Sequence, residues 1–230
     1  MQRVLISLLS FGLTIASVVA QAAGDGKATA LLNQARLAHG GDKQLAAVQT
    51  LSGTGSYTRE IADRQLTGEL TMALQLPDKL LRTETMNPMG DLTVVTALGI
   101  NGDTLLRDQH TMNASPGAMI RMAPAPTGDA AAQAVRNARA DLARTVLAFL
   151  LTSPASLPVD FTYAGEAEAS DGRADVIEAK GAGNFAVQLF LDKTTHRPLM
   201  LAYKGAAPQI RITTQRGGEP PHDREGGGKA

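Results

Sequence analysis

Apolar and polar side chains alternate through most of residues 64–76, RQLTGELTMALQL. The leucines and the methionine share one face, while glutamine, threonine and glutamate side chains share the other. A period of two is the pattern of a β-strand with one buried face. Residues 79–86 and 92–100 are expected as the next strands, because turn sequences at 77–78 and 88–91 separate the segments. The pattern predicts consecutive strands of an antiparallel sheet.

The sequence Asn101-Gly102-Asp103 interrupts an apolar run and is followed at once by two leucines. Asp103 has two readings: it belongs to a reactive or metal-binding site, or it belongs to a tight turn. Asn-Gly between two apolar strand patterns is the strongest short signal for a hairpin, because both residues tolerate positive φ. We therefore interpret these residues as a hairpin turn.

Two segments follow the helical period instead. Residues 27–39 place leucine and alanine side chains on one face, and two glycines end the segment. Residues 130–151 carry the strongest helical pattern in the chain, with Asp129 as a plausible N-cap and Pro154 as the stop. The apolar stripe of this second helix consists of Val135, Ala138, Leu142, Val146 and Phe149.

Short period-two segments return between residues 159 and 215, at a spacing of roughly ten residues that is typical of an antiparallel meander. Together with the first half, they predict an α+β fold. We expect one strongly curved antiparallel sheet of about nine to eleven strands. The helix near residues 130–151 is expected to lie against the concave face of this sheet.

The two ends of the chain differ from its middle. Residues 1–22 have the features of a cleavable signal peptide: one early charge, a short apolar run and the small-x-small sequence Ala20-Gln21-Ala22. The apolar run is shorter than the roughly twenty residues that a membrane-spanning helix needs. We expect an exported, periplasmic protein with a single domain over residues 23–215. Residues 216–230 lack large apolar side chains and are expected to form a disordered tail.

Composition excludes several classes of function. The chain has no cysteine, which rules out disulfides and thiolate metal sites. Removal of Arg3 with the signal peptide leaves 21 basic against 22 acidic side chains, a net charge of −1. This balance argues against a nucleic-acid partner, because nucleic-acid binding normally needs a basic face.

No spaced cluster of histidines and carboxylates is present, so we predict no metal, no organic cofactor and no catalytic residue. His196 lies in a turn sequence and is expected to be solvated. Glu69 and Glu84 form a carboxylate pair only if the fold brings them together, and outward-facing charges are the default expectation. The glycines of residues 52–58, SGTGSYT, lack the ending of a phosphate-binding loop and are expected to relieve crowding in a curved strand.

The sheet and the long helix can enclose the interior in two ways. The helix either packs permanently on the sheet or acts as a lid over a cavity that receives an apolar ligand. Strand alternation and the helical stripe predict which side chains face inward. The predicted ligand-cavity residues are Leu70, Met72, Leu74, Val94, Leu98, Leu142, Val146, Phe149, Leu189, Leu191, Leu199 and Leu201.

The order of the segments AHGGDKQLAAVQTLSGTGSY, LPDKLLRTETM, GINGDTLLRD and FLDKTTHRPLML resembles the outer-membrane lipoprotein carrier superfamily, including its lipoprotein-sorting-protein-like branch. The resemblance spans roughly residues 27–214 and implies an unclosed antiparallel barrel whose hydrophobic cavity is covered by helices. Leu76 stands where the true carrier has an arginine that helps to hold the lid. Leu105-Leu106 stand where the family usually has an aromatic residue. The fold inference survives both departures, whereas delivery of lipoproteins depends on a residue that is absent.

The resemblance implies a periplasmic binding or carrier protein, not an enzyme, that holds an acyl chain, a lipid or a lipidated partner under a helical lid. We expect a monomer whose ligand is a lipid or an acylated protein, with a transient protein partner in the cell envelope. Two alternatives stay open. One is an exported hydrolytic enzyme whose site the sequence does not reveal, and the other is a cell-envelope interaction module with a filled core.

Overall fold

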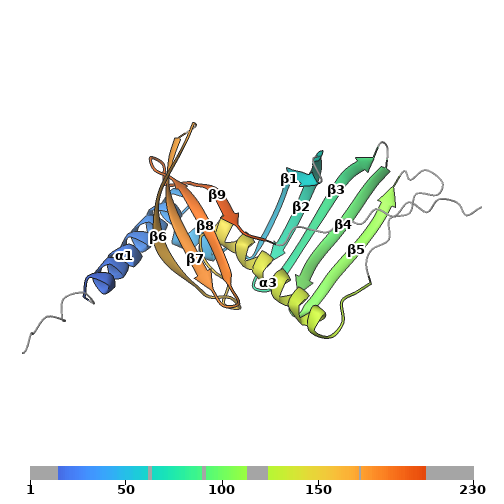
Figure 1. Cartoon of the computed structure of the whole chain (residues 1–230), viewed down its shortest axis with the longest axis horizontal. Helices are drawn as coiled ribbons and strands as arrows, with labels where there is room; N and C mark the ends of the chain where they lie inside the picture. The colour runs from blue at the N-terminus through green and yellow to red at the C-terminus, as the bar shows by residue number, and fades with distance from the viewer. Residues whose placement is uncertain (1–14, 62–63, 90–91, 113–123, 171, 206–230) are drawn as a thin grey trace, which may run out of the picture.

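A computed structural model of the chain describes residues 15–61, 64–89, 92–112, 124–170 and 172–205 (Figure 1). These residues form an α+β fold with two antiparallel sheets, one of five strands and one of four. The nine described strands are therefore divided between two sheets, and they do not form the single sheet of about nine to eleven strands that we expected.

The five-stranded sheet, sheet A, is a meander in which each strand pairs with the next one along the chain. Its strands are β1 (Thr50–Ile61), β2 (Arg64–Gln75), β3 (Lys79–Met89), β4 (Leu92–Asn101) and β5 (Thr104–Met112). Gly102, at φ 60°, forms the turn between β4 and β5, as the Asn-Gly sequence predicts. The structural interpretation of Asp103 is confirmed, because this residue lies in the same turn.

The four-stranded sheet, sheet B, is a second meander. Its strands are β6 (Val159–Ala169), β7 (Gly172–Gly181), β8 (Phe185–Asp192) and β9 (Pro198–Tyr203). The three helices are α1 (Ile15–Ala38), α2 (Asp42–Ala46) and α3 (Gly128–Leu150). In chain order α3 stands between the two meanders, and in space it packs against both sheets (Figure 1).

Helix α3 carries two apolar stripes, one for each sheet. Leu142, Val146 and Leu150 are buried against sheet A. Ala143 and Leu147, one position further round the helix, are buried against sheet B. Each sheet therefore buries an apolar face on the same helix, and a single continuous sheet is not needed to close the core.

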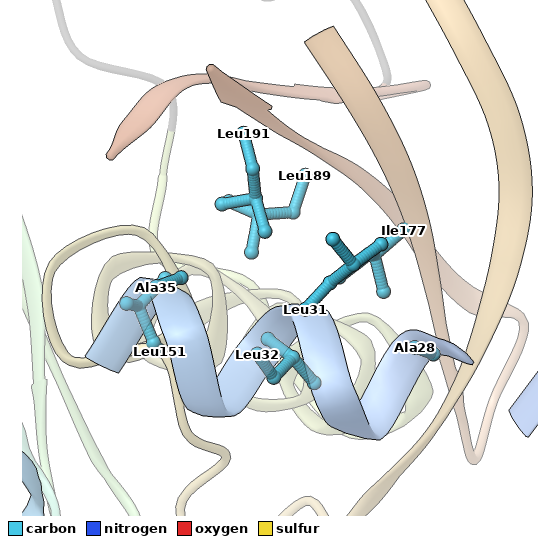
Figure 2. Close-up of a cluster of buried hydrophobic side chains, with 8 residues drawn as sticks. All are labelled: Ala28, Leu31, Leu32, Ala35, Leu151, Ile177, Leu189 and Leu191. Atoms are coloured by element: carbon cyan, nitrogen blue, oxygen red, sulfur yellow. The ribbon is translucent and has the colours of Figure 1, made fainter. Parts of the chain in front are cut away.

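Helix α1 packs against a second part of the apolar surface of sheet B (Figure 2). This cluster consists of Ala28, Leu31, Leu32 and Ala35 of α1 with Leu151, Ile177, Leu189 and Leu191. Arg36 joins α1 to the end of α3, because its guanidinium donates two hydrogen bonds, 3.0 and 2.7 Å long, to the Leu151 carbonyl. That carbonyl belongs to the C-cap of α3, where carbonyl groups lack helical partners.

The predicted signal-peptide cleavage after Ala22 falls within α1, which runs from Ile15 to Ala38. The α1 side chains of the buried cluster all follow that position. Residues 1–14, the expected strand at 209–215 and the expected tail at 216–230 lie outside the described residues. Among the helices of the described ranges, none combines the length and the hydropathy that crossing a bilayer requires.

The glycines of β1 do not relieve crowding, contrary to our expectation. A Cβ atom added at Gly53 or Gly55 would meet nothing within 4 Å. The crowded positions lie on other strands. An added Cβ would lie 2.5 Å from the Thr85 carbonyl oxygen and 2.6 Å from the Tyr57 ring at Gly68 of β2, and 2.2 Å from the Leu80 carbonyl oxygen at Gly99 of β4. At both positions a side chain would overlap a neighbouring strand.

Candidate ligand-binding groove

The face of sheet A that packs against α3, here called the inner face, changes in chemistry along its strands. The antiparallel register aligns side chains in rows across β3, β4 and β5. From the end that packs on α3 outward, the rows are Leu80, Ile100 and Leu105; then Arg82, Leu98 and Arg107; then Glu84, Thr96 and Gln109. A fourth row, Met86, Val94 and Thr111, follows. The inner face is therefore apolar at the α3 end, basic and then polar in the middle, and apolar again where Met86 and Val94 are buried.

A groove of about 300 Å³ lies between these rows and the N-terminal half of α3. We call it the α3 groove. It is lined by Leu80, Arg82, Glu84, Thr96, Leu98, Gly99, Leu105, Leu106, Arg107, Ala134, Asn137, Ala138 and Asp141. Its volume is at the lower end of the range for small-molecule sites, and leucine and alanine side chains dominate its apolar part.

The two halves of α3 have different roles. No residue from 128 to 141 is buried, and this half forms the wall of the α3 groove. From Leu142 onward the helix belongs to the core. An ion pair between Arg139 of α3 and Asp103 of the β4–β5 turn joins the exposed half to sheet A. The lid hypothesis therefore applies only to the N-terminal half of α3, because the C-terminal half is held between two sheets.

The charges on the floor of the α3 groove form a shared network. The Glu84 carboxylate accepts a hydrogen bond from Arg59 at 2.9 Å and forms an ion pair with Arg82 at 2.7 Å, and its side chain is 15% exposed. Burial, followed by the negative charge of Glu84, raises the pKa of Tyr57, which lies nearby on the same face. The Nε of Arg82 is buried without a hydrogen-bond partner among the described residues.

The residues predicted to line one cavity fall into several places. Leu98 lines the α3 groove, while Leu74, Leu142 and Val146 lie in the packed cluster beside it, with Met72 partly buried against them. Leu70 is half-buried on the inner face. Val94 packs in a separate cluster with Met86 and Leu92. Leu189 and Leu191 lie under α1, and Leu201 is half-buried near α3 on sheet B.

The prediction that Phe149 and Leu199 face inward was wrong, because their exposed fractions are 42% and 60%. Two sheets share the helix, and the next residue, Leu150, is the one that is buried against sheet A. Phe149 therefore lies at the edge of the buried part of the α3 surface. Leu76 is partly buried against the cluster of Leu142 and Val146, to which it contributes apolar contact.

The chemical candidates from the sequence do not come together. Glu69 and Glu84 project from opposite faces of sheet A, because Leu70 of β2 is the cross-strand partner of Glu84. Glu84 points inward, contrary to the default expectation. His196 is half-buried and not solvated as we expected, and its Nδ1 has no partner within the described residues. In the described part of the chain no three histidine or carboxylate side chains are grouped as metal ligands.

Sequence reasoning missed Arg82 and Arg107 as polar residues of the α3 groove, and it considered Glu84 only as one of a carboxylate pair with Glu69. The sequence did contain a signal for an inward-facing charge, because alternation along β3 places Arg82 and Glu84 on the same face as Leu80. Alternation within β3 does not say which residue of β5 lies beside Arg82. That information comes only from the cross-strand register, which joins Arg82 to Arg107 through Leu98.

No family model matches the sequence. The search of curated proteins finds no match either. Among solved structures, the chain is similar to a DUF1329 family protein from Desulfovibrio piger, with 10% sequence identity and a TM-score of 0.31. The match covers 75% of this chain and 71% of that one. This likeness is a distant structural resemblance and assigns no function to the chain.

Proposed function

We propose that the protein is an exported binding or carrier protein that holds the apolar part of a lipid, an acyl chain or a lipidated partner in the α3 groove. The observation that carries this proposal is an open groove with an apolar floor beside a packed core. Leu98, on the inner face of β4, is 46% exposed, whereas Leu80 and Ile100 in the adjacent row are buried. An exposed large apolar side chain in a concave site is available for contact with a ligand.

The groove favours binding over the alternative of a filled interaction module. Its apolar row is continuous with the cluster that anchors α3, so a chain lying on Leu98 also contacts Leu80 and Leu105. In this proposal the N-terminal half of α3, in which Val135 and Ala138 are only partly buried against the cluster of Leu142, moves to admit such a chain. This restricted lid replaces the whole-helix lid that we expected from the sequence.

The proposal is tested by displacement of a fluorescent fatty acid from purified protein of residues 23–230. Leu98→Ala is expected to weaken binding about tenfold, because it removes roughly 1.4 kcal/mol of apolar contact. Leu81→Ala is the matched control. Leu81 is 40% exposed on the same sheet, but it points to the opposite face, where its cross-strand partner is Gly99.

Three outcomes oppose the proposal: no binding of any apolar probe by the wild-type protein, equal binding by the two variants, or weaker binding by Leu81→Ala alone. Native mass spectrometry of the purified protein gives an independent check, since a carrier is expected to retain co-purifying lipid.

Export is part of the same proposal. Mass measurement of the mature protein is expected to show a new N-terminus at Ala23.

A further inference from the structure

The basic row of the α3 groove lies directly on its apolar floor. Arg82 and Arg107 flank Leu98 in one register row, on strands two inter-strand spacings apart, or about 10 Å. Both arginines line the groove together with Leu98. A ligand whose chain crosses Leu98 therefore has a guanidinium on each side.

The carboxylates near the groove leave positive charge uncompensated. Glu84 is shared between Arg59 and Arg82, so one negative charge faces two positive ones. Asp141 of α3 is already paired with Arg144, at 2.6 Å. The Arg107 side chain, which is exposed on β5, has no ion pair or hydrogen bond with any other described residue. The four charged residues of the groove lining sum to zero, but Arg59 and Arg144, outside the lining, each pair with one of the two carboxylates. Four arginines therefore face two carboxylates, which leaves two positive charges uncompensated among these six residues.

We propose that Arg82 and Arg107 form an anion subsite of the α3 groove, and that its ligand is a single-chain anionic amphiphile. The head group lies between the two guanidinium groups, and the chain lies over Leu98 and the leucine row beside it. Guanidinium groups bind carboxylates and related anions through paired, charge-assisted hydrogen bonds. A single chain suits the small volume of the groove. This inference rests on the proposed function and adds the chemical class of the ligand.

The test compares dodecanoate, dodecanol and dodecylammonium, which share one chain and differ in head-group charge. Binding is measured by calorimetry at pH 8 in low salt. We expect dodecanoate to bind about tenfold more tightly than dodecanol, because a charged hydrogen bond of moderate strength corresponds to a factor of this size. The advantage should shrink in high salt, which screens partly exposed charges.

Arg107→Gln is expected to remove most of the advantage of dodecanoate and to leave the binding of dodecanol unchanged. Arg107→Glu should further reverse the preference toward dodecylammonium. Arg136→Gln is the matched control, because it removes the same charge from the exposed surface of α3 outside the groove lining. Since Arg107 is exposed and unpaired within the described ranges, its replacement is not expected to unfold the protein, and circular dichroism checks this.

The outcomes separate the two proposals. If neither dodecanoate nor dodecanol binds, the proposed function itself fails. If both bind with equal affinity, or if Arg107→Gln weakens both equally, the groove is an apolar site without an anion subsite and the further inference is overturned. If Arg107→Gln and Arg136→Gln weaken the binding of dodecanoate equally, the preference for dodecanoate comes from the overall charge of the protein. This result would also overturn the further inference.

Discussion

Truncation of Leu142 measures whether α3 is a structural helix or a movable one. Leu142 is 1% exposed and packs with Leu74, Leu80 and Ile100 of sheet A. Buried leucine-to-alanine changes cost about 2–5 kcal/mol, depending on how far the surroundings collapse into the cavity. Here collapse is restricted, because Leu147 holds the same helix against sheet B. We therefore expect Leu142→Ala to cost about 4 kcal/mol, in the upper half of that range.

The assay is urea unfolding of the mature protein, followed by circular dichroism, with the free energy of unfolding compared at equal slope. Phe149→Ala on the same helix is the control. Because Phe149 is 42% exposed, its truncation should cost only about 1 kcal/mol. A cost below about 1.5 kcal/mol for Leu142→Ala would refute the reasoning, since α3 would then leave sheet A without a large penalty and the whole helix would behave as a lid.

Two further predictions concern stability. Gly68→Ala should lower the free energy of unfolding by about 1–3 kcal/mol in urea titrations, because the added Cβ overlaps a neighbouring strand. Gly55→Ala is the control and should change this free energy little, because Gly55 has open space around it. Equal costs for the two variants would contradict the crowding argument. Hydrogen bonds from the Thr195 backbone N–H and hydroxyl hold the pKa of Asp192 below its usual value. Because the pKa of Asp192 is lower in the folded protein than in the unfolded chain, the ionised carboxylate stabilises the fold at pH values above the unfolded pKa of about 4. This stabilisation is lost as the pH falls through the folded pKa. Asp192→Asn should therefore be less stable than wild type at pH 7, and the free energies of unfolding of the two proteins in urea titrations should converge as the pH decreases. A difference that stays constant down to pH 2 would contradict this prediction.

The local structure was largely predictable from the sequence. The strands at residues 64–75 and 92–101 and the long helix begin and end within two residues of the predicted bounds. The hairpin turn at Asn101-Gly102 was also predictable. These features depend on hydrophobic period and turn chemistry, which are properties of neighbouring residues in the chain. The N-cap of α3 is the exception, since Thr127 takes the position expected for Asp129.

The division into two sheets and the composition of the α3 groove were decided only by the tertiary structure. Alternation determines which residues of one strand share a face, but it does not determine which strands are neighbours or where α3 lies between them. The position of Arg82 beside Leu98 and Arg107 depends on the register across three strands. The exposure of Phe149 likewise depends on two sheets sharing one helix. Contacts between residues distant in the chain carry this information, and periodicity within a segment does not contain it.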